Sequence, residues 1–209
     1  MFDIIEKGGI LMYPIMLLSV ISLAIFMERM YTLRKEKFAP AGFTKMIKSL
    51  LSRKAYSEAE SLCEENDFAV SRIIYEIIQN RSKPWLQLVD TVESAGKREA
   101  DRLGSFQEAL STIAVLSPLV GLLGTIFGMI TLFSVLSGGG VGNPQELSGG
   151  IAVALLTTAA GLSVAIPAQV FYYVVKTRSD VIINVLEKES SDIAGIISAE
   201  YGNEVQKDK

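Results

Sequence analysis

The chain has 209 residues, of which 49% are hydrophobic and 21% are charged, and its formal net charge is −3. It contains no histidine and a single cysteine, Cys63. It therefore lacks the commonest general base and metal ligand, and a Ser-His-Asp or Cys-His enzyme is excluded. The slightly acidic charge gives no reason to expect a nucleic-acid partner, and no GK[ST] phosphate loop is present. We expect no enzyme, no cofactor and no metal site.

The N-terminal part of the chain predicts a first membrane span. Residues 1–9 carry little charge, and residues 10–28 contain an uncharged run just long enough to cross a membrane as a helix. The basic residues Arg34, Lys35 and Lys37 follow this run. Because basic residues concentrate on the cytoplasmic side of membrane proteins, we expect an extracytoplasmic (periplasmic) N-terminus.

Residues 29–108 mix acidic and basic residues and show no alternating strand pattern. Val70, Ile73, Ile74, Ile77 and Ile78 recur at helical spacing, which predicts a helix that is apolar on one side. No proline interrupts the stretch from about residue 86 to residue 117, so a helix is expected to continue from this region straight into the membrane. We interpret the region as cytoplasmic and helical.

Two further spans are predicted at 109–137 and 150–175, neither of which contains a charged residue. Each exceeds the roughly 20 residues that cross the hydrocarbon core. The connection at 138–149 has one acidic and no basic residue and is expected outside the cytoplasm. Residues 176–209 continue as a cytoplasmic amphipathic helix and tail. The predicted fold is an all-α integral membrane protein with three transmembrane helices and long cytoplasmic helical extensions.

Small residues are concentrated in the second and third spans. Gly121, Gly124 and Gly128 fall on one helical face, and such residues let membrane helices approach closely. Packing within the hairpin explains part of this pattern, while small residues on several sides predict a homo-oligomer. Pro118 and Pro167 are expected to kink or loosen their helices. The small residues of the third span are Ala152, Ala159, Ala160, Gly161, Ala165 and Ala168.

Hydroxyl side chains lie near the middle of the same two spans, at Thr125, Thr157 and Thr158. Such hydroxyls commonly bond to carbonyls of their own helix. The alternative is that they line a polar path for ions. No Asp, Glu, Lys or Arg lies inside the three uncharged runs, so a proton carrier would have to come from water or from a partner.

The spans resemble the MotA/TolQ/ExbB proton channel family, and within it the ExbB/TolQ branch. The similar segments are PIMLLSVISLAIFMER, SPLVGLLGTIFGMI and GGIAVALLTTAAGLSVAIPAQVFYYVV. The pairing of GLLGT with TTAAGL and AIPA is the most specific feature. MotA proteins are similar in the core but have four spans, which favours the ExbB/TolQ branch.

The resemblance implies a pentameric ring in the bacterial inner membrane that surrounds the single-span helices of an ExbD- or TolR-like partner. That partner would supply a membrane Asp, and threonines matching Thr125 and Thr158 would face the pore. A TonB- or TolA-like protein would carry the work to the outer membrane. Valine stands at Val153, where familiar members have Glu, which leaves more of the proton transfer to the partner.

The resemblance implies ExbB-like energising of TonB-dependent transport. A TolQ-like role in envelope maintenance, another ExbB-like machine for gliding or secretion, and sodium in place of protons remain open. A structural membrane scaffold without ion flux is the alternative from a different class.

Overall fold

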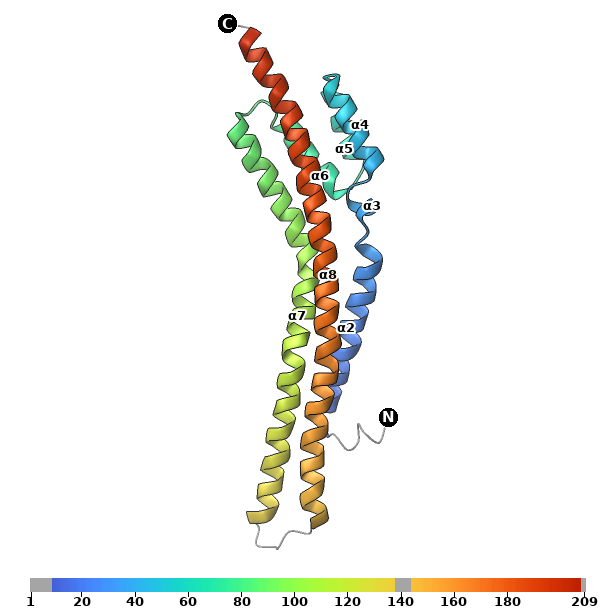
Figure 1. Ribbon diagram of the computed structural model, residues 1–209, viewed down its shortest axis with the longest axis vertical. Coiled ribbons are helices and arrows are strands. Elements are labelled where there is room, and N and C mark those ends of the chain that lie inside the picture. Colours follow the sequence, from blue (N-terminus) through green and yellow to red (C-terminus); the bar gives the residue numbers. More distant parts are fainter. Residues whose placement is uncertain (1–8, 138–143, 208–209) are drawn as a thin grey trace. The chain divides into compact units, whose positions relative to one another are not determined.

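The computed structural model describes residues 9–137 and 144–207 of the chain. Every regular element of these residues is a helix, as Figure 1 shows. The elements are α2 (Met12–Thr32), α3 (Lys35–Phe38), α4 (Ala41–Ser52), α5 (Tyr56–Glu65), α6 (Ala69–Gln79), α7 (Trp85–Ser137) and α8 (Pro144–Lys207).

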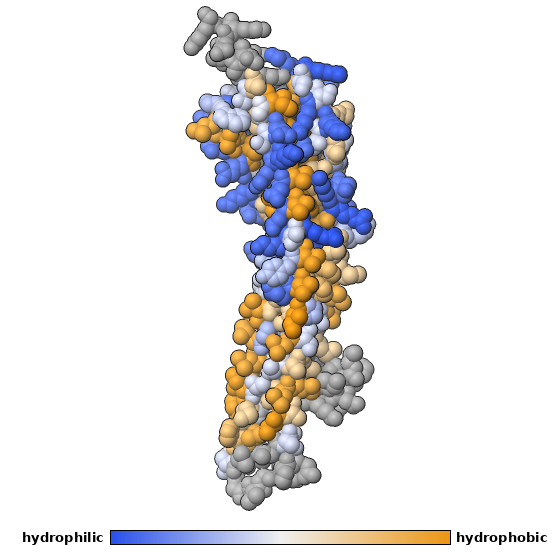
Figure 2. Space-filling view, in the orientation of Figure 1, coloured by the Kyte–Doolittle hydropathy of each residue, from blue (hydrophilic) through white to orange (hydrophobic). Residues whose placement is uncertain are grey.

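Three of these helices are long and apolar enough to cross a membrane, within α2, α7 and α8. Their apolar side chains are largely exposed on the protein surface, as Figure 2 shows by the hydrophobic colouring of the spans. Lipid or another protein chain must cover this surface, because exposure of so large an apolar area to water is unfavourable. The chain is therefore an all-α membrane protein, as the sequence predicts.

The helix boundaries differ from the predicted ones in two places. Helix α2 begins at Met12 and ends at Thr32, whereas the sequence predicts the first span at 10–28. Helix α8 begins at Pro144, so residues 144–149 are helical, whereas the sequence places them in the connection 138–149. Proline suits the first turn of a helix because its φ is already fixed there and its missing N–H has no partner to lose. The remaining connecting residues, 138–143, and the N-terminal residues 1–8 lie outside the described residues.

The chain divides into two compact units. The membrane unit comprises Met1–Arg29 and Phe106–Val175, and the hydrophilic unit comprises Met30–Ser105 and Lys176–Lys209. In the membrane unit, Ile113, Ala114 and Ala168 form a buried cluster against which Leu18 and Ile25 of α2 pack.

The hydrophilic unit has a conventional apolar core. The predicted apolar face of α6 is buried: Val70, Ile74, Ile77 and Ile78 are fully inaccessible and Ile73 is 1% exposed. The amphipathic pattern after the third span also forms part of this core. Its buried members on α8 are Ile182, Leu186, Ile193 and Ile197.

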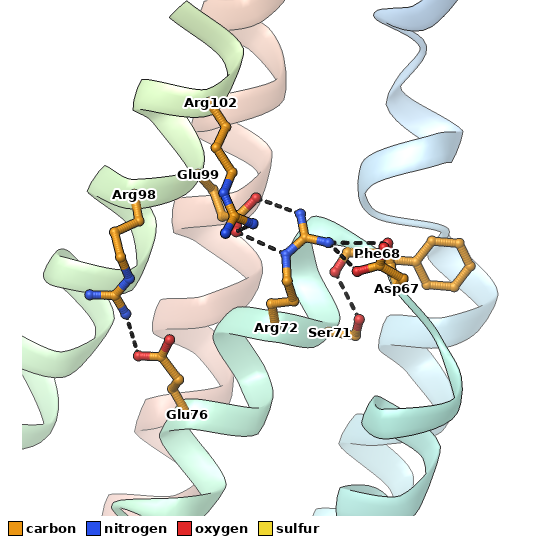
Figure 3. Close-up of polar contacts among 8 residues, drawn as sticks. All are labelled: Asp67, Phe68, Ser71, Arg72, Glu76, Arg98, Glu99 and Arg102. Carbon is orange, nitrogen blue, oxygen red and sulfur yellow. Dashed lines mark hydrogen bonds and ion pairs between the residues drawn. The ribbon is translucent and has the colours of Figure 1, made fainter.

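Ion pairs join the helices of the hydrophilic unit. Figure 3 shows Glu99 of α7 accepting hydrogen bonds from both Arg72 of α6 and Arg102 of its own helix, at 2.6 and 2.9 Å for the shortest contacts. The Glu99 side chain is only 8% exposed, so its charge depends on these partners. A second connection joins Lys48 of α4 to Glu189 and Asp192 of α8, at 2.8 and 2.9 Å.

Candidate functional site in the membrane unit

Glycine faces glycine where helices α7 and α8 pack tightly against each other. A Cβ placed on Gly161 would lie 2.6 Å from the Ser117 carbonyl oxygen and 3.1 Å from the Gly121 Cα. A Cβ on Gly121 would lie 2.9 Å from the Thr157 carbonyl oxygen. Because these neighbours are backbone atoms, neither position accommodates a larger residue without separating the helices.

The same contact continues along α7 towards its C-terminal end. A Cβ on Gly124 would lie 2.5 Å from the Thr157 Cβ, and one on Gly128 would lie 2.8 Å from the Ala154 Cβ. The glycine face that the sequence predicts is therefore the surface that packs on α8. The predicted packing role fits the geometry at Gly121, Gly124, Gly128 and Gly161 alike.

Thr158 connects the two helices by a hydrogen bond. Its hydroxyl donates to the Gly121 carbonyl oxygen of α7 at 3.1 Å. Thr158 therefore bonds a neighbouring helix, whereas threonines in membrane helices commonly bond a carbonyl of their own helix. A hydroxyl has one donor and two acceptor lone pairs, so Thr158 retains the capacity to accept a hydrogen bond from another group.

Thr157 and Thr125 bond within their own helices. The Thr157 hydroxyl is buried against α7 and donates to the Ala154 carbonyl oxygen at 2.9 Å. The Thr125 hydroxyl donates to the Leu122 carbonyl oxygen at 2.7 Å, on a partly exposed side of α7. The structure thus places Thr157 and Thr158 at the α7–α8 contact, whereas Thr125 lies on a partly exposed side of α7.

A cavity of about 180 Å³ lies beside Thr157 and is lined mainly by apolar atoms. Val153 lies on its wall together with Gly9, Ile10 and Leu11 at the start of the first span. Neither Thr125 nor Thr158 lines this cavity. Since adjacent residues are rotated by about 100° around a helix axis, Thr157 and Thr158 face different sides of α8. Val153 therefore shares the cavity wall with Thr157 and not with Thr158.

Both prolines lie inside uninterrupted helices, Pro118 within α7 and Pro167 within α8. Each removes one backbone donor, but neither ends its helix. The neighbouring Ser117 is fully buried, and its hydroxyl donates to the Ile113 carbonyl oxygen at 2.7 Å. Neither proline interrupts its helix, and the kink or loosening expected at each stays a prediction.

One charged residue of the membrane unit was not singled out from the sequence. The Arg29 guanidinium lies over the Phe106 ring, 3.7 Å from its centroid, and pairs with Glu28 at 2.6 Å. Arg29 is 8% exposed. A basic residue directly after an uncharged run was the available signal, but its partner on α7 is remote in sequence. The contact fixes the end of α2 against α7.

The exposed surface of α8 also carries small residues. Ala152, Ala159 and Ser163 are exposed and lie on the side of α8 opposite Gly161, which is buried against α7. The hairpin contact therefore leaves part of the predicted small-residue surface uncovered.

The chemistry available in the spans is limited to hydroxyls and backbone carbonyls. The sequence places no Asp, Glu, Lys or Arg in residues 109–137 or 150–175. Across the described ranges, no group of three His, Cys, Asp or Glu side chains is arranged to hold a metal ion. Hydroxyls can donate to or accept from a carboxyl group, but they do not titrate in the physiological range.

Comparison with known proteins agrees with this picture. A model of the MotA/TolQ/ExbB proton channel family matches residues 65–188. An ExbB-like biopolymer transport protein of Synechocystis is 30% identical over 166 residues, covering 78% of this chain and 79% of that protein. The biopolymer transport protein exbB1 of Vibrio cholerae is 27% identical over 179 residues, covering 78% and 73%.

A TolQ protein is also similar. The Tol-Pal system protein TolQ of Haemophilus influenzae is 38% identical over 95 residues, covering 46% of this chain and 40% of that protein. The family match covers more than half of the chain and includes α7 and most of the third span. The chain belongs to the MotA/TolQ/ExbB proton channel family, in its ExbB/TolQ branch.

Proposed function

We propose that the protein is the ring-forming subunit of a proton-driven inner-membrane motor of the ExbB type. In this proposal five copies surround the membrane helices of an ExbD-like partner, and proton flow drives movement of that partner relative to the ring. The motor would energise TonB-dependent transport across the outer membrane. The chain would have its N-terminus in the periplasm and its C-terminus in the cytoplasm.

The observation that carries the proposal is the combination of paired hydroxyls with the absence of Asp, Glu, Lys and Arg from residues 109–137 and 150–175. A member of a proton-channel family needs a titratable carrier at mid-membrane, and residues 109–137 and 150–175 of this chain contain no Asp, Glu, Lys or Arg. The carrier then has to come from the partner. A single Asp in the partner's span would meet this requirement.

The hydrogen bonds of Thr158 and Thr125 suit a role beside such a carboxyl group. Each hydroxyl hydrogen is directed at a backbone carbonyl, of Gly121 and Leu122 respectively. The hydroxyl oxygens can therefore accept a hydrogen bond from a protonated Asp. When the Asp loses its proton, rotation of a hydroxyl would provide a donor for the carboxylate. We assign Thr125 and Thr158 to the pore side, and Thr157 to a supporting position behind it.

The exposed small residues of α8 support assembly into a ring. Ala152, Ala159 and Ser163 remain uncovered by the hairpin partner. Small residues permit close packing of membrane helices between copies, where lipid gives no hydrophobic driving force.

A TolQ-like role is the second candidate, because a TolQ protein is among the relatives. In that case the partners would be TolR-like and TolA-like, and the function would be maintenance of the envelope. Identification of the third component, TonB-like or TolA-like, distinguishes the two roles. A structural scaffold without ion flux is the candidate from outside this mechanism.

The test is purification of the complex from native membranes in mild detergent, followed by mass measurement of the intact complex and identification of its components. A closed homo-oligomer that retains a single-span protein with a membrane Asp is the expected result. A bare oligomer, or a partner without a membrane carboxyl group, would contradict the motor and favour the scaffold.

A further inference from the structure

A cavity in the hydrophilic unit lies beside the ends of two membrane spans. It has a volume of about 210 Å³ and is lined by Leu33, Lys35, Thr177, Arg178, Val181 and Ile182. Leu33 directly follows α2, and Thr177 lies two residues beyond the end of the membrane unit at Val175. Both walls therefore lie close in sequence to the end of an apolar span.

The wall of this cavity is basic. Lys35 and Arg178 contribute two positive charges, and no carboxylate lines the cavity. Within the described parts of the chain, neither residue has an ion-pair partner, whereas Lys48, Arg72 and Arg98 each pair with an acidic side chain. Two exposed and uncompensated cations at one cavity favour an anionic ligand.

The neighbouring cations, on Arg34 and Lys37, lie over an aromatic ring. The Arg34 guanidinium and the Lys37 ammonium lie 5.3 and 4.6 Å from the centroid of the Tyr31 ring. Tyr31 is 67% exposed, and exposed tyrosines near the end of a span commonly mark the lipid headgroup level. Lys35, between these two residues in sequence, lines the cavity.

The floor and rim of the cavity are apolar. Leu33 and Ile182 are 4% and 3% exposed and form a buried floor, while Val181 is 52% exposed at the rim. A free inorganic anion would gain nothing from this apolar surface. A phospholipid would use both parts, since its phosphate meets the cations and its glycerol and first acyl carbons meet the apolar atoms.

We propose that this cavity binds the phosphate headgroup of an anionic membrane phospholipid, held by Lys35 and Arg178. The site depends on the membrane location of the spans and not on ion flux. Each basic residue near an anionic membrane surface strengthens the binding of an anionic lipid. Removal of both charges should therefore weaken the affinity for the lipid about 30-fold.

The test uses the full-length complex in mild detergent, titrated with phosphatidylglycerol and observed by intact-mass measurement of bound lipid. The double variant Lys35→Gln with Arg178→Gln is expected to bind about 30-fold more weakly. The control Lys45→Gln with Lys83→Gln removes the same charge from exposed positions outside the cavity, and it should bind as the wild type does.

Other ligands and further variants test whether the cavity binds an anionic phospholipid. Phosphatidylcholine, which has no net charge, should bind much more weakly than phosphatidylglycerol, and millimolar inorganic phosphate should not displace the lipid. If the double variant fails to assemble, the charge-preserving pair Lys35→Arg with Arg178→Lys should retain binding, and Val181→Glu should weaken it. Unchanged binding by the double variant or by Val181→Glu, equal binding of phosphatidylcholine, or displacement by phosphate would overturn the proposal.

Discussion

The Thr158 hydroxyl of α8 donates a hydrogen bond to the Gly121 carbonyl oxygen of α7 at 3.1 Å. The bond forms where a side chain on Gly121 would lie 3.1 Å from the Thr158 Cα. A polar side chain is thus held at a close contact of two membrane helices, with its acceptor lone pairs available to a third group. This arrangement can combine packing with a role in the ion path.

Replacement of Thr158 separates these two roles. Hydrogen bonds between membrane helices contribute about 0.6 kcal/mol on average, so Thr158→Val should lower thermal stability only slightly and leave assembly intact. Proton flux with the partner should nevertheless fall by at least tenfold. The reason is that a hydrogen bond to the group that transfers the proton lowers the barrier by on the order of 1.4 kcal/mol or more. Flux into liposomes that contain the complex measures this loss.

Two controls accompany this measurement. Thr158→Ser keeps the hydroxyl and should retain most of the flux. Thr112→Val removes a hydroxyl that bonds the Glu108 carbonyl oxygen of its own helix at 2.8 Å, and it should leave flux unchanged. Wild-type flux in Thr158→Val would remove this residue from the ion path.

The glycine contact should be intolerant of a single methyl group. Gly161→Ala would place a Cβ 2.6 Å from the Ser117 carbonyl oxygen, and such overpacking typically costs about 1–3 kcal/mol. We expect a clear decrease of the thermal unfolding temperature in detergent.

Gly195→Ala is the matched control on the same helix. No atom lies within 4 Å of a Cβ placed on Gly195, and alanine favours a helix over glycine by up to about 1 kcal/mol. This variant should be as stable as the wild type or more stable. Equal stability of both variants would mean that the helices do not pack at Gly161.

The buried carboxylate of Glu99 should stabilise the hydrophilic unit. Glu99→Gln leaves Arg72 without its buried charge partner, and we expect a loss of about 1–2 kcal/mol in the free energy of unfolding. Asp67→Asn alters a pair whose carboxylate is 91% exposed, so its effect should stay below about 0.5 kcal/mol. Denaturant or thermal unfolding measures both changes. A larger effect at Asp67 than at Glu99 would contradict the assignment of the main contact.

Cys63 should be unreactive in the folded protein. Burial raises the pKa of its thiol to about 12, so the thiol remains protonated at pH 8, and alkylation requires the thiolate. The unfolded thiol ionises near its ordinary pKa of about 8.5. Because the folded thiol holds its proton to a higher pH than the unfolded thiol, ionisation of Cys63 favours the unfolded state above that pH. The free energy of unfolding is therefore unaffected by this thiol below that pH and falls as the pH rises towards 12.

Iodoacetamide labelling at pH 8, followed by mass measurement, checks this prediction. Labelling should be slow in the native protein and fast after unfolding in denaturant. Ser61→Cys in a Cys63→Ser background moves the thiol to an exposed position of α5 and should restore fast labelling. Rapid native labelling of Cys63 would show that the thiol is accessible.

The general architecture could be predicted because long-range information is not needed for it. Uncharged runs identify the spans, and the absence of proline before Pro118 predicts that α7 continues into the membrane. The apolar spacing around Ile73 and Ile77 likewise predicts which side of α6 is buried.

The local surroundings of the hydroxyls could not be predicted. Whether Thr158 bonds its own helix or the Gly121 carbonyl depends on the register between α7 and α8, which no local pattern specifies. The same holds for Arg29, whose aromatic partner Phe106 is remote in sequence. The start of α8 at Pro144 was missed because the polar, glycine-containing stretch resembles a loop in composition.

The central claim is that this chain forms a proton path only together with a partner that supplies a membrane carboxyl group. The most direct measurement is proton uptake by liposomes under an imposed potential, with the purified chain alone, with its partner, and with a partner whose membrane Asp is replaced by Asn. The account predicts flux only for the chain with the intact partner. Flux through the chain alone, or unchanged flux with the Asn partner, would contradict it.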